Sequence, residues 1–198
     1  FEFLARVWDE YTSILEPRLE GDDVMGIIGS NPLVYGYDKA VLVSCDKDFK
    51  TIPDCDFLWC TTGNILVQTQ ETADWWHAYQ MVKGDMTDGY GGIPGWGDTA
   101  EGFLNEPHIV EPVVSVLKSG KNKGQEVTKW VKRSPEPGET LWDCIKSIGA
   151  KAGMEPEDII KQGQMARILR SDEYNIETGE ITLWDPSLSE KLLLSSLS

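Results

Sequence analysis

Apolar positions at the start of the chain recur with the period of a helix. The residues in this pattern are Phe1, Leu4, Trp8, Tyr11 and Leu15. The pattern predicts a helix that ends before Pro17, because a proline disfavours helical geometry in the residue that precedes it. A second helix is predicted from about Asp22 to Gly29, and its buried stripe should consist of Val24, Ile27 and Ile28.

The next segment has the pattern of strands. Residues 40–44 are a short apolar run that stops at an acidic loop, as a buried parallel strand does at its carboxyl end. Residues 57–60 and 64–69 should pair as strands around Thr62-Gly63, and a helix should follow over 71–83. This order predicts an α/β fold, in which ligands bind beyond the carboxyl ends of the strands.

The second half of the chain begins with a glycine-rich run. Residues 84–97 contain six Gly and one Pro, which predicts a loop or hairpin before a short helix over 99–104. Two further helices are expected over 139–152 and 156–170, the second starting at Glu155-Pro156. A closing hairpin should pair 174–176 with 181–184 around Thr178-Gly179, and the Ser/Leu-rich tail from Pro186 should fray.

Composition predicts a globular chain with one domain, or one domain and an appendage. The chain has 198 residues, of which 40% are hydrophobic. Its four cysteines lack a Cys-x-x-Cys pair and there are only two histidines, so reduced structural thiols are expected rather than a zinc site. No apolar run approaches the roughly 18 to 20 residues of a membrane span, which predicts a cytoplasmic protein.

The net charge of −15 argues at first against a nucleic-acid partner, but the charge is unevenly spread. Residues 1–56 carry twelve acidic and five basic side chains, whereas 117–133 carry six basic side chains and one acidic one. In this basic stretch, Trp130 stands among Lys129, Lys132 and Arg133. The stretch is either a track for phosphates with a stacking residue or a solvated basic loop.

Three acidic clusters stand at the ends of predicted elements. They are Glu20-Gly21-Asp22-Asp23, Asp46-Lys47-Asp48 and Asp85-Met86-Thr87-Asp88. Carboxylates serve phosphodiester hydrolysis by holding two hard cations about 4 Å apart, and oxygen ligands select Mg²⁺ or Mn²⁺. Each cluster also has a plain structural interpretation, as a helix N-terminus, a strand end or a turn.

The run Gly92-Ile93-Pro94-Gly95-Trp96-Gly97 predicts a tight turn. Its backbone N–H groups, with the following helix N-terminus near Thr99, could hold a phosphate, and the alternative is a plain interhelical turn. The run is not a nucleotide P-loop, because no Gly-Lys-Ser/Thr follows it.

The order of these motifs resembles the 5′-nuclease superfamily, which includes flap endonucleases. Three stretches are more closely similar to the double-strand-specific 5′→3′ exonucleases of short-tailed coliphages: VLVSCDKDFKTIPDCDFLWCTTGNI, LKSGKNKGQEVTKWVKR and TLWDCIKSIGAKAGM. The resemblance covers about residues 1–185. Many members of the wider superfamily carry a Lys just after the glycine turn, whereas this chain continues with Asp98-Thr99.

The resemblance implies a set of site residues. The expected metal ligands are Glu20, Asp22, Asp23, Asp46, Asp48, Asp85 and Asp88, and Asp46, Asp48, Asp22 and Glu20 are also the expected catalytic residues. The expected DNA-binding residues are Gly92, Gly95, Gly97, Thr99, Lys129, Lys132 and Arg133. Two Mg²⁺ ions, replaceable by Mn²⁺, are implied as cofactors, and a K⁺ ion at the helix–turn–helix is a further candidate.

The resemblance also implies an organisation and a partner. Residues 1–83 would be the remnant of a mainly parallel-sheet nuclease domain, 84–185 a helix–turn–helix DNA-binding region and 186–198 a disordered tail. An N-terminal strand with a further metal-binding Asp and a basic helical arch would both lie outside this chain. The expected substrate is double-stranded DNA with 5′ ends, extending to flaps and RNA–DNA hybrids, in phage replication within the infected host cytoplasm. No membrane association and no obligate protein partner are predicted.

Three hypotheses for function follow from the sequence. The first is a magnesium-dependent 5′→3′ exonuclease. The second is a non-catalytic DNA-binding remnant, because the N-terminal metal ligand and the arch would be absent. The third is a carboxylate phosphohydrolase of small substrates, which the acids alone permit and which the turn at 92–97 disfavours.

Overall fold

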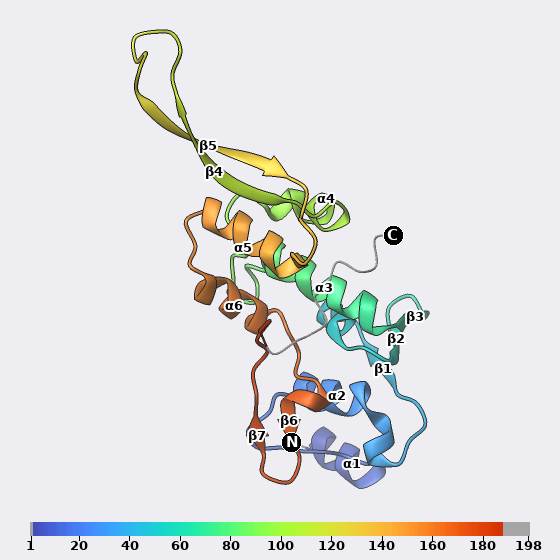
Figure 1. Ribbon diagram of the computed structural model, residues 1–198. Coiled ribbons are helices and arrows are strands. Elements are labelled where there is room, and N and C mark those ends of the chain that lie inside the picture. Colours follow the sequence, from blue (N-terminus) through green and yellow to red (C-terminus); the bar gives the residue numbers. More distant parts are fainter. Residues whose placement is uncertain (1, 188–198) are drawn as a thin grey trace. The chain divides into compact units, whose positions relative to one another are not determined.

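The computed structural model describes residues 2–187 and shows a mixed α/β chain (Figure 1). The chain divides into two units. The first unit combines the residues up to 73 with 168–182, and the second combines 74–167 with the residues from 183 onward. The predicted division at 83/84 and 185/186 stays a prediction, and residues 188–198 of the tail lie outside the described residues.

The centre of the first unit is a small mixed sheet in the order β1–β2–β3. Its strands are β1 (Val41–Ser44), β2 (Cys55–Trp59) and β3 (Asn64–Gln68), and β1 runs parallel to β2 whereas β3 runs antiparallel to it. The predicted strands and the β2–β3 hairpin are therefore confirmed to within two or three residues. The sheet is mixed because the four residues between β2 and β3 can join only antiparallel neighbours.

One face of this sheet carries the core of the first unit. Leu42 and Phe57 lie side by side on this face, and Phe57 is fully buried against the rings of Phe49 and Trp59. Ile52 and Ile168 complete the cluster. The same unit contains helix α2 (Gly21–Ser30) and the two 3-10 turns η1 (Pro32–Tyr35) and η2 (Lys47–Thr51). On α2 only Ile27 of the predicted stripe is fully buried, and Val24 and Ile28 are half-buried.

The segment 168–182 returns to α2 and closes the first unit. The Asp23 carboxylate accepts a hydrogen bond from the Leu169 amide at 3.1 Å, and the Ser30 hydroxyl accepts one from the Ser171 amide at 2.8 Å. A Cβ at Gly26 would collide with the Leu169 carbonyl, so glycine is required where the two segments cross. The 3-10 turn η4 (Ser171–Glu173) follows, and then the predicted hairpin of β6 (Tyr174–Asn175) and β7 (Glu180–Ile181), whose second strand ends at Ile181 rather than at the predicted Trp184.

The second unit is built on helices α3 (Gln70–Lys83), α4 (Ala100–Asn105), α5 (Leu141–Lys151) and α6 (Pro156–Met165), with the 3-10 turn η3 (Gly97–Thr99) preceding α4. Its core consists mainly of aliphatic residues, including Ile145, Ile148 and Ile159, together with Trp184. A capping box starts α5, because the Thr140 hydroxyl and the Asp143 carboxylate each accept a bond from the other residue's backbone amide.

A long β-hairpin in the second unit was not predicted. Strands β4 (Ile109–Val116) and β5 (Glu126–Arg133) pair antiparallel over eight residues each, and the hairpin projects away from the helices of its unit (Figure 1). The interpretation of 117–133 as a solvated loop was therefore wrong for its second half, which is a strand. The Val- and Thr-rich sequences on both sides of 117–125 are the signal that could have indicated it.

Two predicted helices are shorter in the structure than in the sequence pattern. Helix α1 (Glu2–Glu10) ends six residues before the predicted limit, since Tyr11, Ile14 and Leu15 are exposed and Thr12 and Ser13 are poor helix formers. Phe1 of the predicted apolar face lies outside the described residues. Helix α6 ends at Met165 rather than Arg170, because residues 168–170 adopt the extended path that bonds to α2.

The predicted burial of β1 on both faces was also wrong. Strand β1 is an edge strand, and Val41 and Val43 are 53% and 54% exposed. They form an apolar face of the sheet together with side chains at matching register positions of β2 and β3, namely Leu58, Ile65 and Val67. We call these five residues the open sheet face. The salt bridge Lys39–Asp56, at 2.7 Å, is the polar feature of this surface.

An exposed apolar face beside an unpaired strand edge favours association with another copy. We expect the chain to self-associate at micromolar concentration, and we expect Val43→Lys to make it monomeric without changing its thermal unfolding midpoint. Multi-angle light scattering after size-exclusion chromatography measures this. Met165→Lys, at an exposed apolar position of α6, is the matched control and should leave association unchanged. A monomeric parent chain would contradict the prediction.

Candidate functional site

The loop that follows β1 brings Asp46 and Asp48 together. The Asp46 amide donates to the Ser44 hydroxyl at 3.0 Å, and the Asp46 carboxylate caps η2 by accepting from the Asp48 amide at 2.9 Å. The Lys47 ammonium lies 3.0 Å from the Asp48 carboxylate. The pair is thus held by local turn geometry, and Lys47 offsets part of the repulsion between the two charges.

The acids around the start of α2 have different roles in the structure. Glu20 is the N-cap residue, but its side chain makes no cap hydrogen bond. The Asp22 carboxylate accepts from the neighbouring Asp23 amide, and the Asp23 carboxylate is engaged with the Leu169 amide. All three stand where the helix dipole stabilises negative charge. Asp23 therefore has a structural role in closing the first unit, whichever further role it has.

Asp85 and Asp88 lie in the second unit, in the glycine-rich loop after α3. The Asp85 carboxylate accepts from the Thr87 amide at 2.8 Å, and the backbones of Asp85 and Tyr90 pair across the loop. Within residues 2–187, no three His, Cys, Asp or Glu side chains come together as a group that could hold a metal ion. The described acids alone do not fit a complete metal site, and their assignment as metal ligands stays a prediction.

The turn at 92–97 is a close crossing of two backbone segments. Gly92 and Gly84 both have positive φ, at 65° and 79°, and a Cβ on either would collide with the other segment's backbone. The Gly92 amide donates to the Gln162 side chain at 2.8 Å, so Gly92 serves the packing of α6. A phosphate contact through backbone N–H groups is therefore better placed at Gly95 and Gly97, which lie further along the turn and are more exposed.

A groove of about 710 Å³ adjoins this turn in the second unit. It brings together Thr99, from the turn after the glycines, with Lys132 and Arg133 of β5. Three aromatic side chains that the sequence did not single out also line it, namely Trp96, Phe103 and His108, and the ring centroids of Trp96 and His108 are 5.9 Å apart. No spacing motif in the sequence joins residues 96–108 with 132–133, because the contact depends on the fold of the hairpin.

The three predicted basic contacts are not equivalent. Side chains alternate along a strand, so Lys129 and Lys132 lie on opposite faces of the hairpin. The Arg133 guanidinium is bound to two carboxylates, Glu139 and Glu111, with nitrogen–oxygen distances of 2.6 and 3.0 Å. Arg133 thus clamps the base of the hairpin, and Lys132 is the exposed cation on the groove side.

The hydrogen bonds between Arg133 and Glu139 shift the pKa of both side chains. The hydrogen bonds from Arg133 lower the pKa of Glu139 to about 2, and the hydrogen bonds to Glu139 and Glu111 raise the pKa of Arg133. Because the pKa of Glu139 is lower in the folded chain than in the unfolded one, the ion pair of Arg133 and Glu139 stabilises the folded chain fully above the ordinary pKa of about 4.3. Its contribution is lost as the pH falls from there towards about 2.

This shift can be measured on the side chain itself. Carbon-detected NMR of the Glu139 carboxyl should show a midpoint near pH 2 in the parent chain. In Arg133→Gln it should move up towards the ordinary value of about 4.3, because the donor of two of its three hydrogen bonds is gone and only the Glu136 amide remains. An unchanged midpoint in the variant would contradict the clamp.

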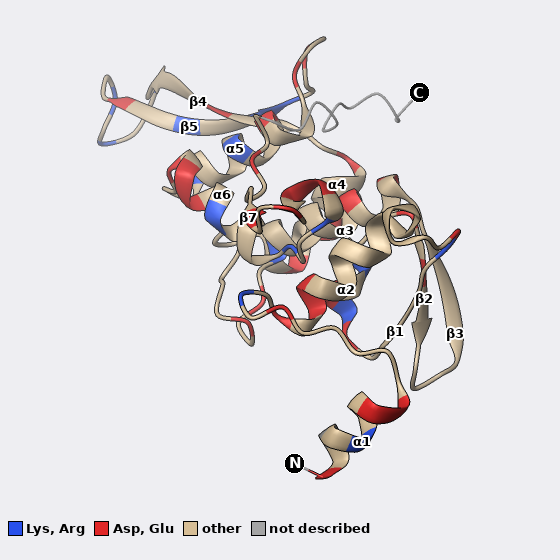
Figure 2. Ribbon diagram, turned by 90° about the horizontal axis from the view of Figure 1, so that it is seen from below, with Lys and Arg blue, Asp and Glu red and all other residues tan. Residues whose placement is uncertain are grey.

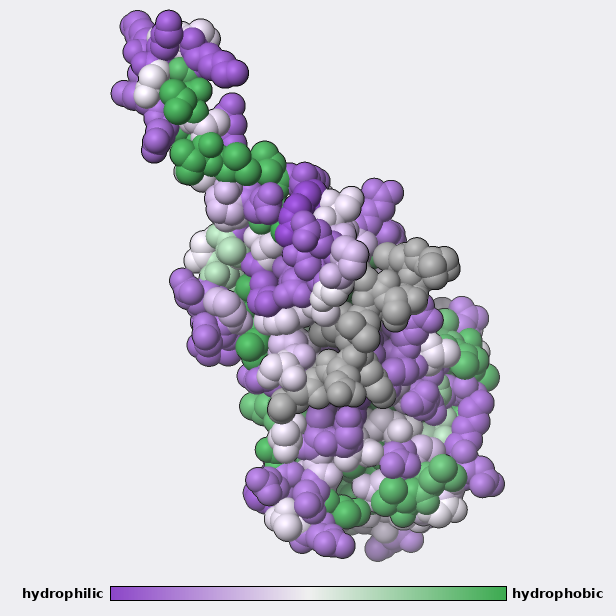
Figure 3. Space-filling model, in the orientation of Figure 1, coloured by the Kyte–Doolittle hydropathy of each residue, from purple (hydrophilic) through white to green (hydrophobic). Residues whose placement is uncertain are grey.

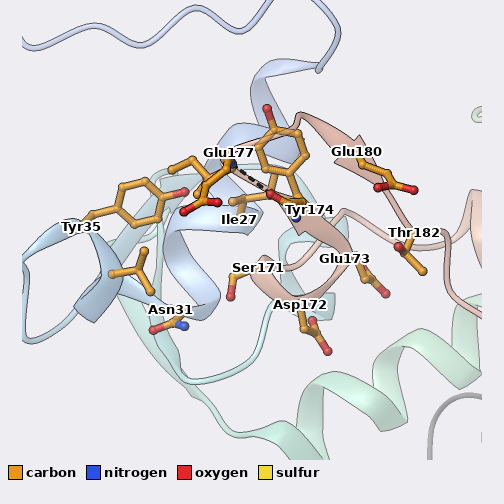
Figure 4. A pocket seen from close by; sticks show the side chains of 13 residues that line it. Ile27, Asn31, Tyr35, Ser171, Asp172, Glu173, Tyr174, Glu177, Glu180 and Thr182 are labelled. Atoms are coloured by element: carbon orange, nitrogen blue, oxygen red, sulfur yellow. Dashed lines mark hydrogen bonds between the residues drawn. The ribbon is translucent and has the colours of Figure 1, made fainter.

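The cavity of the first unit is unsuited to a polyanion. It measures about 560 Å³ and lies between α2, η1 and the segment 171–182 (Figure 4). Its lining contains four carboxylates and no Lys or Arg: Asp172, Glu173, Glu177 and Glu180. Burial and the nearby Tyr174 raise the pKa of Tyr35 at its edge. A phosphate would meet only negative charge here, so the groove of the second unit is the better candidate for a nucleic acid.

A disulfide joins the loops after β1 and β2, which corrects the expectation of four reduced thiols. Cys45 and Cys60 are bonded across Cα atoms 5.6 Å apart. Ser44 pairs with Trp59 at the ends of the two parallel strands, so the next residues of each strand are neighbours. Cys55 and Cys144 are free and buried as predicted, and burial raises their pKa to about 12 and about 11.

The disulfide closes a loop over a sequence separation of 15 residues, next to Asp46. A loop of this length predicts that Cys60→Ser lowers the free energy of unfolding by about 3 kcal/mol. Urea unfolding of the oxidised chain measures the loss. Dithiothreitol should destabilise the parent by a similar amount and leave Cys60→Ser unaffected, whereas equal sensitivity of both proteins to the reductant would contradict the bond.

Comparison with known proteins finds two phage exonucleases that are similar to the chain in sequence, whereas no family model and no solved structure matches it. It is 74% identical over 188 residues to the "Exodeoxyribonuclease" of Enterobacteria phage T3, an alignment that covers 94% of this chain and 62% of that protein. It is 73% identical over 188 residues to the "Exonuclease" of Escherichia phage T7, covering 63% of that protein.

The chain is therefore a close homologue of these two exonucleases, which confirms the predicted resemblance. It spans about three fifths of the length of the relatives it matches. No helix among the described residues is long and apolar enough to cross a membrane.

Proposed function

We propose that this chain is part of a metal-dependent 5′→3′ exonuclease that hydrolyses double-stranded DNA from its 5′ ends. The observation that carries the proposal is its 74% identity, over 94% of its length, to a phage exodeoxyribonuclease. Flaps and RNA–DNA hybrids are proposed as further substrates. Because the chain spans 62% of that relative, the activity is proposed for the longer enzyme, and the share of it in these 198 residues is open to experiment.

In this proposal the first unit is part of a 5′-nuclease domain, and its acids serve the chemistry. Asp46 and Asp48, at the carboxyl end of β1, are the central pair, and Glu20, Asp22 and Asp23 begin the helix before it. Two Mg²⁺ ions, or Mn²⁺, would supply the activated water. The described acids do not by themselves assemble a complete set of ligands for these ions.

The second unit is proposed to grip the duplex. Helix α3, the glycine turn and α4 would act as the helix–turn–helix, in which Gly95, Gly97 and Thr99 contact a phosphate near Lys132. Asp85 and Asp88, in the same loop as the glycines, are the proposed acids for the second metal ion. A K⁺ ion at this turn belongs to the same proposal.

A non-catalytic DNA-binding chain is the second candidate. The observation that favours it is the lack of any group of three ligands within residues 2–187. The two candidates differ in one outcome only, because both predict binding to duplex DNA and only the first predicts cleavage by this chain.

Release of label from a 5′-labelled duplex in the presence of Mg²⁺ tests the proposal. We expect Asp46→Ala to reduce release by about 100-fold or more, since a lost metal ligand should cost at least what a lost supporting residue does. Duplex affinity should be unchanged or slightly higher, because a repulsive charge is removed. Asp38→Ala, which removes an exposed acid outside the clusters, is the matched control and should cleave like the parent.

Three results are informative. Metal-dependent release that is lost only in Asp46→Ala supports both the activity and the site. Equal release from parent and Asp46→Ala contradicts the assignment of that site. Binding without release, from a chain that unfolds cooperatively, favours the second candidate.

A further inference from the structure

We infer that the β4–β5 hairpin is an arm that holds the backbone of duplex DNA along one of its faces, with three lysines of its tip as the outermost contacts. The tip lysines are Lys118, Lys121 and Lys123. The inference rests on the proposed function for its DNA partner. It extends that function to a second contact surface, which reaches beyond the groove at Thr99.

The charge of the hairpin is opposite to that of the rest of the chain. Residues 109–133 carry six basic and two acidic side chains, whereas the other residues carry twelve basic and 31 acidic ones. Figure 2 shows Lys and Arg on β5 and on the loop that joins the strands. A polyanion is the partner that this local charge favours, because most of the remaining surface repels it.

The hairpin lysines are also available for a partner. Many lysines elsewhere in the chain are paired, including Lys39 with Asp56, Lys146 with Asp143 and Lys161 with Asp158. Within the described part of the chain, the five lysines of the hairpin have neither an ion pair nor a hydrogen bond: Lys118, Lys121, Lys123, Lys129 and Lys132. Arg133, the remaining cation, is committed to the clamp at the base.

The base of the hairpin is fixed while its outer part is exposed. Ile109 and Val110 are buried, and the Val110 amide donates to the Ser147 hydroxyl of α5 at 2.9 Å. Further out, Val114 and Val116 are 61% and 54% exposed, and Figure 3 shows a hydrophobic stem below a mostly hydrophilic tip. An isolated two-stranded ribbon is marginally stable in water. A partner that covers the stem would stabilise it.

One face of the ribbon combines a cation with an aromatic ring in line with the groove. Strand register places Lys132 opposite Val110 and Trp130 opposite Pro112, so both side chains share a face with Val114. Lys132 lines the groove with Thr99. Trp130, 38% exposed, is the next β5 residue outward on that face, and Thr128 and Glu126 follow it before the loop that carries the tip lysines. Groove, ring and tip follow one another along the ribbon as one track, and a two-stranded ribbon fits the major groove of B-DNA.

The length of the track sets how much DNA it covers. Eight residues per strand at about 3.3 Å each reach roughly 26 Å, or about eight base pairs at 3.4 Å per pair. The duplex held by the second unit should therefore be about eight base pairs longer than one held by the groove alone. Lys129 projects from the opposite face and is predicted to contribute less than Lys132.

Binding to fluorescent blunt duplexes in EDTA tests the arm without cleavage. We expect Lys118→Gln/Lys121→Gln/Lys123→Gln to bind more weakly and to make the slope of log affinity against log salt less negative by about 2.7, or 0.9 per phosphate contact. Affinity should rise with duplex length and then level off, and the variant should reach this plateau at a duplex about eight base pairs shorter than the parent does.

Two controls separate this contact from general charge and from misfolding. The triple Lys→Arg variant at the same positions keeps the charge and should retain the slope of the parent. Arg6→Gln/Lys161→Gln removes two positive charges that are locally paired in helices, and it should shift the slope by less than one unit. Circular dichroism melting shows whether each variant is folded, and single Lys→Gln variants at the tip replace the triple one should it fail.

The outcomes also distinguish the arm from the proposed function. A parent-like slope for the triple Gln variant, in a chain that binds DNA, overturns the arm and leaves the exonuclease proposal standing. Equal losses for Lys129→Gln and Lys132→Gln overturn the single-face contact. A parent chain that binds no duplex at all overturns the DNA partner on which both proposals rest.

Discussion

The return of residues 168–182 to helix α2 is the contact on which the first unit depends. Two side chains of α2, Asp23 and Ser30, accept hydrogen bonds from backbone amides more than 140 residues away in sequence. The Arg170 guanidinium reaches the Thr51 carbonyl at 3.0 Å, and Gly26 leaves room for the crossing. These bonds satisfy buried backbone groups that the small sheet cannot satisfy by itself. A residue of the predicted metal set, Asp23, is thereby also a structural residue.

Sequence patterns predicted the local elements well, because each has a local cause. The run at 40–44, the turn at Thr62-Gly63 and the helix over 71–83 are all set by residues close to one another. The patterns failed where distant contacts decide the outcome. Helix α6 stops early because Leu169 bonds to Asp23, and among the described strands β1 pairs with β2 alone.

The candidate site shows the same division between local and distant causes. The motif around Asp46 and Asp48 does place the two acids together, since a single turn holds them. The groove lined by Thr99, Lys132 and Trp96 could not be predicted from the spacing of residues in the sequence, because the pairing of β4 with β5 creates it. Strand alternation also separates Lys129 from Lys132, a distinction that a count of charges cannot make. The bond between Cys45 and Cys60 likewise follows only from the parallel alignment of β1 and β2.

The closing segment has a consequence for the order in which the protein forms during synthesis. A ribosome releases α2 and the three strands of the sheet long before residues 168–182, which complete their unit, have been made. The second unit has its helices and hairpin in the continuous stretch 74–167, and of its core only Trp184 is made after residue 182, so most of its contacts can form before the first unit is closed. The first unit, which begins earlier in this sequence, is thus closed only after residues 74–167 of the second unit have been made. Its apolar surfaces are exposed to chaperones and to neighbouring nascent chains throughout that interval.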